Sequence, residues 1–255
     1  STLFPYTTLF RSGRRGKLMF LSVVRIVGVL LALISLTMCI PLTAALVYGE
    51  YAVLSAFAIP AAVCIVFETV LFCLTRGSVF KLNSRTGFIV VAFSWLGACF
   101  FGALPFLLSG CIPAFDDALF ESVSGFTTTG ATILSEVESL PRSINLWRMQ
   151  MHWLGGMGIV ALTVALLPIL GVGGFQLIKA ETTGPEKGKI TPKITVTAKI
   201  LWFIYIALTL VQTVLLMCAG MDFFDALGHS FATVGTGGFR SEEHTSELQS
   251  RSAIS

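Results

Sequence analysis

Charged residues are scarce in this sequence. Only 12% of its 255 residues are Asp, Glu, Lys or Arg, whereas 55% are hydrophobic and the mean hydropathy is +0.84. A soluble domain carries about 25% charged residues, so this composition excludes that class and indicates a protein that crosses a lipid bilayer several times. The net charge of +3 is small and the basic residues lie in short loops, which argues against nucleic acid as a partner.

The sequence also lacks the side-chain patterns of enzymes and metal centres. Its six cysteines do not show the paired spacings of zinc sites or disulfide frameworks, so we interpret them as small apolar residues buried in the protein. No nucleophile accompanies a general base, and we predict no enzymatic activity, no bound cofactor and no transition-metal site. We interpret His152 and His229 as hydrogen-bonded packing residues rather than metal ligands. Gly155 and Gly156, within an apolar run, predict close helix packing.

Long apolar runs are abundant. Each of five runs is long enough for a membrane-spanning helix, and they cover residues 22–47, 52–75, 86–109, 146–170 and 196–220. Lysine and arginine gather before the first run and in the loops after the second and fourth, whereas the other loops are acidic. The positive-inside rule therefore predicts a cytoplasmic N-terminus. The acidic loops then lie outside the cell, where they would concentrate cations.

A short segment occurs twice, 108 residues apart. ESVSGFTTTGA at 121–131 is matched in kind by HSFATVGTGGF at 229–239, and six identities in the fourteen positions from Asp117 indicate an internal duplication. Each copy predicts a helix of about ten residues, ending near Phe126 and Val234, which is too short to cross a bilayer. We expect both helices to be re-entrant from the outside. The alternative, two ordinary Gly/Thr-rich external loops, is less compatible with repetition in register.

Small residues follow each short helix, so the chain can turn back in an extended form with its carbonyl oxygens facing a dehydrated cation. Such irregular backbone survives at membrane depth only where it lines a wet cavity. TVGTG at 233–237 is similar to the TVGYG of potassium channels, but the internal repeat places the central glycine at Gly238, opposite Gly130. The predicted ion-binding residues are Thr127, Thr128, Thr129, Gly130, Ala131, Gly235, Thr236, Gly237, Gly238 and Phe239. A complete filter needs about four such hairpins around one axis.

Three stretches resemble a known family: FDDALFESVSGFTTTGAT, MHWLGGMGIVALTVALLPILGVGGFQLIKAETTGPEK and FDALGHSFATVGTGGF. They resemble the Trk/Ktr/HKT superfamily of potassium uptake proteins, and within it the TrkH type, over residues 19–240. The resemblance implies an all-α pore-forming subunit for potassium uptake across the bacterial inner membrane. It further implies four repeats of span, re-entrant helix, filter and span after two extra helices, a homodimer, and a cytosolic nucleotide-binding regulatory subunit of the TrkA type. This chain would correspond to the N-terminal half, and a non-conducting truncated fragment or scaffold stays open as the alternative.

The predicted organisation follows from these repeats. Two extra helices occupy 19–85, a complete pore repeat 86–170, a cytoplasmic loop 171–195 and a truncated repeat 196–240. The loop is either a solvated linker or a docking surface for the regulatory subunit. The ends at 1–18 and 241–255 are excluded from the fold, because STLFPYTTLFRS and SEEHTSELQSR resemble translated sequencing-adaptor sequence. Disordered polar tails are the alternative interpretation.

Overall fold

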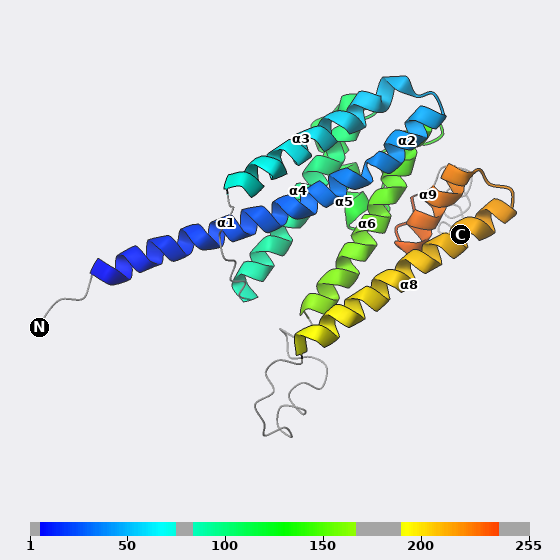
Figure 1. The fold of residues 1–255 in the computed structure, drawn as a ribbon. Helices are drawn as coiled ribbons and strands as arrows, with labels where there is room; N and C mark the ends of the chain where they lie inside the picture. The colour runs from blue at the N-terminus through cyan, green and yellow to red at the C-terminus, as the bar shows by residue number, and fades with distance from the viewer. Residues whose placement is uncertain (1–5, 75–83, 167–189, 240–255) are drawn as a thin grey trace, which may run out of the picture.

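The computed structural model describes residues 6–74, 84–166 and 190–239, and within these ranges the regular structure is helical (Figure 1). The helices are α1 (Tyr6–Thr37), α2 (Cys39–Val47), η1 (Tyr51–Val53), α3 (Leu54–Leu74), α4 (Ser84–Ser109), α5 (Phe115–Phe126), α6 (Arg142–Leu166), α8 (Ile190–Cys218) and α9 (Phe223–Val234).

Four of the predicted membrane spans are confirmed by length and composition, at Val23–Val47, Tyr51–Cys73, Gly87–Ser109 and Val196–Cys218. The first span is interrupted at Met38, where α1 ends and α2 begins. The fifth predicted span, 146–170, coincides with α6 as far as Leu166, and its remainder lies outside the described residues. The chain is therefore a polytopic membrane protein, and its described spans are helical.

Three expectations from the sequence need correction. Helix α1 begins at Tyr6, inside the segment 1–18 that we excluded, and α8 begins at Ile190 rather than near 196, because a helix continues wherever its backbone can keep bonding. The prediction that all six cysteines are buried was also wrong, because Cys39, Cys73 and Cys218 are exposed. An apolar exterior is usual for a membrane protein, so small apolar residues are not confined to the interior. Most of the loop 171–195 and all of 241–255 lie outside the described residues.

The two short helices are structural copies of each other. α5 and α9 both contain 12 residues, and their first and last residues differ by the same 108 positions that relate the sequences. Each begins two residues earlier than predicted. In α9 the cause is the carboxylate of Asp222, which accepts a hydrogen bond from the Phe224 amide at 3.4 Å and so caps the first turn. At about 1.5 Å per residue each helix is roughly 18 Å long, well short of a 30 Å hydrocarbon core.

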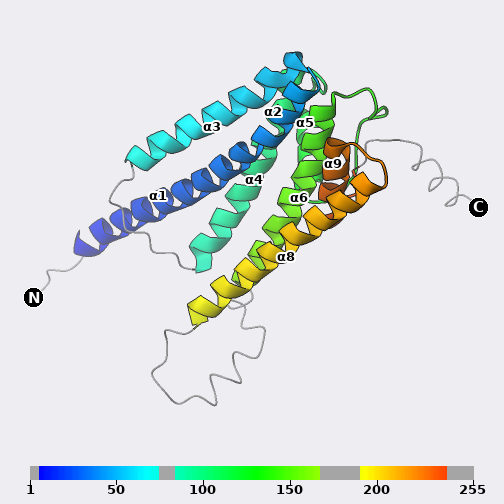
Figure 2. The ribbon, with the colours of Figure 1, turned by 45° about the vertical axis from the view of Figure 1, so that its right-hand side comes forward.

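Helix α6 is the centre of the fold, and Figures 1 and 2 show it between the two short helices and beside α8. Its residues 143–152 are all buried. Trp147 and Met151 on one face join Phe126 in the larger apolar core, whereas Met149 on another face joins Phe231 of α9 in the smaller one. Because residues three to four positions apart share a helix face, one helix supports both re-entrant segments.

Glycines let these elements approach closely, as the sequence predicted. A Cβ atom on Gly155 would lie 2.0 Å from the carbonyl oxygen of Phe126, at the end of α5. A Cβ atom on Gly156 would lie 2.7 Å from the Tyr205 hydroxyl of α8 and 3.1 Å from Cα of Gly235, at the end of α9. Consecutive glycines of α6 therefore receive the C-terminal ends of the two short helices.

Candidate ion-filter site

The backbone turns in the same way after both short helices. Beyond α5, the amides of Thr127, Thr128 and Thr129 donate to the carbonyls four, three and five residues earlier, at 2.9, 3.1 and 3.0 Å. Beyond α9, the amides of Gly235, Thr236 and Gly237 make the same three bonds at 3.0, 3.0 and 2.9 Å. The two segments thus share one turn conformation despite their different side chains.

Backbone dihedral angles fix the register of the repeat. Thr128 and Thr236 both have φ of 56°, and two residues later Gly130 and Gly238 have φ of 75° and 93°. A threonine in the left-handed region is uncommon, so its occurrence at both equivalent positions marks a specific turn. Gly235 has φ of −72° and occupies the place of Thr127. The geometry agrees with the pairing of Gly130 with Gly238 and not with a central glycine at Gly235.

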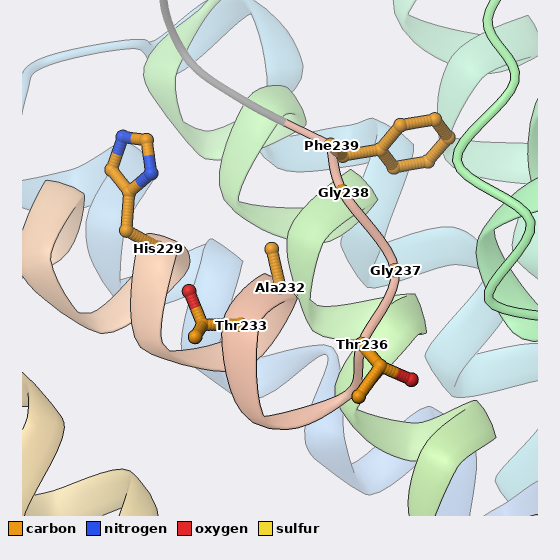
Figure 3. Close-up of a pocket in the computed structure, with 7 residues that line it drawn as sticks. All are labelled: His229, Ala232, Thr233, Thr236, Gly237, Gly238 and Phe239. Atoms are coloured by element: carbon orange, nitrogen blue, oxygen red, sulfur yellow. The ribbon is translucent and has the colours of Figure 1, made fainter.

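The two extended segments touch each other. A Cβ atom on Gly130 would lie 2.0 Å from the carbonyl oxygen of Gly237, a distance that any other residue would have to relieve by moving backbone. Figure 3 shows the second segment reversing at Thr236 and running back beside α9 through Gly237 and Gly238 to Phe239. Backbone atoms of the two repeats therefore meet at this point.

The second segment separates an open side from a packed side. Thr236 and Gly238 are exposed, whereas Gly235, Gly237 and Phe239 are buried against α6. A cavity of about 310 Å³ lies over this segment and the adjacent face of α9; it is lined by His229, Ala232, Thr233, Thr236, Gly237, Gly238 and Phe239 (Figure 3). In the first segment Thr127, Thr129 and Ala131 are exposed, and Thr128 and Gly130 are half-buried.

The predicted filter residues do not all have the same surroundings. The carbonyl of Ala131 accepts a hydrogen bond from the Ser124 hydroxyl at 2.5 Å and is thereby engaged with α5. Ala232 replaces this serine in the second repeat. The hydroxyls of Thr127 and Thr129 lie 2.8 Å apart, and that of Thr127 donates to the Val123 carbonyl at 2.7 Å. These two threonine hydroxyls are engaged within the turn, so the predicted ion site would use its backbone carbonyls.

One buried ion pair, which the sequence analysis missed, lies behind the predicted filter segments. Arg148 of α6 and Glu121 of α5 are 1% and 0% exposed, and Nη2 of the arginine lies 2.6 Å from Oε1 of the glutamate. Arg148 stands inside the predicted span 146–170. The signal that could have found it is that an ionisable residue inside a membrane segment is rare and is usually paired or functional.

Comparison with known proteins places this chain in a family. The family model described as TrkH, a cation transport protein, matches residues 53–245. The chain belongs to the TrkH family. Among curated relatives, the Trk system potassium uptake protein TrkH of Escherichia coli K12 is 47% identical over 226 residues, and that of Halomonas elongata is 44% identical over 223 residues. These alignments cover 88% and 87% of this chain.

A solved structure agrees with the fold. The crystal structure of the potassium transporter TrkH from Vibrio parahaemolyticus matches with a TM-score of 0.75 and 40% sequence identity, over 88% of this chain and 44% of the other. The chain also covers 47% of the E. coli relative and 46% of the Halomonas one. It thus spans about half the length of the family members that it matches. The family to which it belongs is described as one of cation transport proteins.

His152 supports the second predicted filter segment of this TrkH family member by shape rather than by hydrogen bonds. Its ring is fully buried and packs against Phe239 with ring centroids 4.1 Å apart. The prediction that His152 is hydrogen-bonded was wrong: within the described part of the chain neither of its ring nitrogens has a hydrogen-bond partner. The ring fills the space beside Gly237, and its contacts there are with backbone carbon and an aromatic face.

The ends of several helices near α2, α6 and α9 are joined by polar and charged side chains. The carboxylate of Glu50, after α2, accepts hydrogen bonds from the amides of Arg142 and Ser143 at 2.7 and 3.1 Å and so caps the N-terminus of α6. The Tyr48 hydroxyl donates to the Asp222 carboxylate before α9, and the Arg142 guanidinium stacks 4.7 Å above the Tyr48 ring.

This outer cluster shifts two pKa values. Burial, followed by the hydrogen bond to Asp222, raises the pKa of Tyr48 to about 12. The same hydrogen bond holds the pKa of Asp222 below its ordinary value of 3.8. The cluster joins the end of the first span to the N-termini of α6 and α9, and its Tyr48–Asp222 hydrogen bond is strongest in the neutral pH range.

Proposed function

We propose that this chain supplies two of the filter hairpins of a potassium-selective pore, as part of the pore-forming subunit of a Trk-type uptake system. The observation that supports the proposal most strongly is the contact between two hairpins of matching backbone, with Gly130 against the Gly237 carbonyl. The proposed ion is potassium because the relatives are named potassium uptake proteins. The coordinating groups are the backbone carbonyls of 127–131 and 235–239, with Ala131 the weakest member because Ser124 already donates to it.

The mechanism is replacement of the ion's hydration shell by carbonyl oxygens, without alternating access. Asp116 and Asp117 in the first turn of α5 and Asp225 in that of α9 contribute negative charge at the outer entrance. A cation that enters there is drawn inward by the membrane potential, which contributes about 2.3 kcal/mol per charge for each 100 mV. The proposal also includes a homodimer and a cytosolic nucleotide-binding partner. It places the protein in the bacterial inner membrane with a cytoplasmic N-terminus.

A chimaera tests the proposal. Residues 19–240 replace the aligned part of the E. coli relative, which is 47% identical, so that the remaining hairpins come from that protein. The chimaera is expressed in a host without potassium uptake, and growth at low potassium and initial uptake rates are measured with and without competing sodium. We expect growth and a preference for potassium over sodium. The filter assignment would be refuted if the chimaera inserted into the membrane but took up no potassium while the unmodified E. coli relative was active in the same host.

The alternative is that residues 19–240 by themselves form only a membrane-inserted, non-conducting unit. Two hairpins do not complete a ring of about four, and Thr236 and Gly238 are exposed on the open side. Purified fragment in liposomes with a potassium gradient should therefore show the flux of empty vesicles. Potassium-selective flux well above that level would show that copies of the fragment assemble a pore.

A further inference from the structure

We propose that Arg148 is a positioning residue that holds both filter segments at once, with Glu121 as the group that fixes its guanidinium. The inference deepens the proposed potassium filter and rests on it. Neither side chain belongs to the predicted ion-binding residues, and both are buried behind them.

On the first hairpin, the ion pair connects the helix to the returning chain. Nε of Arg148 donates to Oε1 of Glu121 at 2.7 Å, and Nη2 donates to the Thr132 hydroxyl at 3.1 Å. That hydroxyl donates in turn to the Glu121 carboxylate, 3.0 Å from Oε1, and Oε2 accepts from the Ile133 amide at 3.3 Å. Thr132 directly follows the predicted filter residue Ala131, so the network sets the position at which the chain leaves the filter.

On the second hairpin, the same guanidinium supports the equivalent position. Cζ of Arg148 lies 4.3 Å from the centre of the Phe239 ring, which is 2% exposed. By the offset of 108 residues, Phe239 corresponds to Ala131. A planar cation bonded at its edge and stacked on its face requires arginine, because a lysine ammonium lacks both the fork and the flat surface. One side chain thus fixes the exit of two filter segments relative to each other.

The charge of the pair matters for cation passage. An unpaired guanidinium beside a cation filter would repel the ion, whereas the Glu121 carboxylate makes the pair neutral. Asn145 accepts from Nη1 at 3.0 Å and engages the remaining side of the guanidinium. The residue equivalent to Glu121 in the second repeat is His229, so the described part of that repeat offers no carboxylate at this position. In the described residues the first repeat therefore supplies the carboxylate of Glu121, and the guanidinium of Arg148 contacts both repeats.

The experiment separates positioning from simple structural support in the chimaera defined above. Replacing one member of a buried pair leaves an unpaired charge, whereas replacing both by neutral groups of similar size is often tolerated in folding. We therefore compare Arg148→Met, Arg148→Lys and the double variant Glu121→Gln/Arg148→Met. The measurements are the amount in the membrane, the thermal unfolding midpoint, the KM and maximal rate for potassium, and the potassium-to-sodium uptake ratio.

The double variant should accumulate and unfold like the parent chimaera, while its potassium-to-sodium ratio falls about tenfold, equivalent to about 1.4 kcal/mol. Arg148→Lys should also lower the ratio, although it keeps the charge. The matched control is Arg142→Met on the exposed start of α6, whose guanidinium stacks on Tyr48 away from the filter, and it should keep the parental ratio.

Three results would overturn the inference: a parental ratio in the double variant, a parental ratio in Arg148→Lys, or an equal loss in Arg142→Met. The unsubstituted chimaera distinguishes this failure from failure of the proposed function. If it takes up potassium selectively and the Arg148 variants do so equally well, the filter assignment stands and only the positioning role is refuted.

Discussion

Gly237 lies directly against the ring of His152, so closely that a Cβ atom on the glycine would fall 2.0 Å from the ring's Cγ and Cδ2 atoms. At Gly237 the second predicted filter segment meets a side chain of α6, whereas at Gly235 it meets the α6 backbone. The contact with the ring therefore makes the role of Gly237 testable by a compensating substitution.

Gly237→Ala in the chimaera should destabilise the protein by about 1–3 kcal/mol, the usual cost of overpacking, and should reduce potassium uptake. Combining it with His152→Ala should recover most of the stability, because the smaller side chain vacates the space that the new methyl group needs. Thermal unfolding of the detergent-solubilised single and double variants measures this. Additive losses in the double variant would show that the ring is not the obstacle.

Gly130 and Gly238 allow backbone strain to be separated from collision. Both have positive φ, but a Cβ atom on Gly238 meets nothing within 4 Å, whereas one on Gly130 meets the Gly237 carbonyl. We expect Gly130→Ser to abolish the potassium preference and Gly238→Ser to weaken it, as measured by sodium competition in uptake assays. His152→Ala should not rescue Gly130→Ser, because the obstacle there is backbone.

The matched control is Gly220→Ser, at φ of 100°, with open space around it and no place in the filter. It should cost about as much stability as Gly238→Ser, of order 1 kcal/mol for a strained residue, and leave selectivity unchanged. Loss of selectivity in Gly220→Ser would mean that strain anywhere, and not the filter position, is responsible.

The Tyr48–Asp222 contact predicts a pH window of stability. Because the pKa of Asp222 is depressed, its contribution is present above its ordinary pKa of 3.8 and is lost as the pH falls through the lower folded value. Because the pKa of Tyr48 is raised, its contribution is complete below 10.0 and is lost as the pH rises toward about 12.

Tyr48→Phe removes both effects, so the parent should exceed it in unfolding midpoint between about pH 4 and pH 10, and the difference should narrow on either side. Unfolding of both proteins across this range measures the window. The variant keeps the ring that packs against Phe224, with ring centroids 5.5 Å apart, so a constant difference at every pH would show that ionisation of Tyr48 and Asp222 is not the cause.

Orientation is testable by thiol labelling after the native cysteines are replaced. The loop charges predict that a cysteine introduced at Lys187 reacts in intact cells only with a membrane-permeant reagent. A cysteine replacing Glu138, between α5 and α6, should react with permeant and impermeant reagents alike. The reverse pattern would invert the proposed topology and place both hairpins on the cytoplasmic side.

The sequence by itself determined the membrane class, four of the described spans and the two short helices. Those features depend on local properties: an apolar run of sufficient length must become a helix in lipid, and a duplication transfers one turn conformation to a second place. The register that pairs Gly130 with Gly238 was readable for the same reason, since identical spacing of small residues allowed the same φ values at Thr128 and Thr236.

Only the tertiary structure decided which residues meet. The contact of Gly130 with the Gly237 carbonyl and the burial of His152 against Phe239 depend on how helices pack. That packing joins residues far apart in the sequence, such as Tyr48 and Asp222. Arg148 illustrates the limit best: the sequence shows a charge within an apolar run, but its partner Glu121 lies on another helix, 27 positions away. Burial requires such a charge to be paired, and only the fold selects the partner.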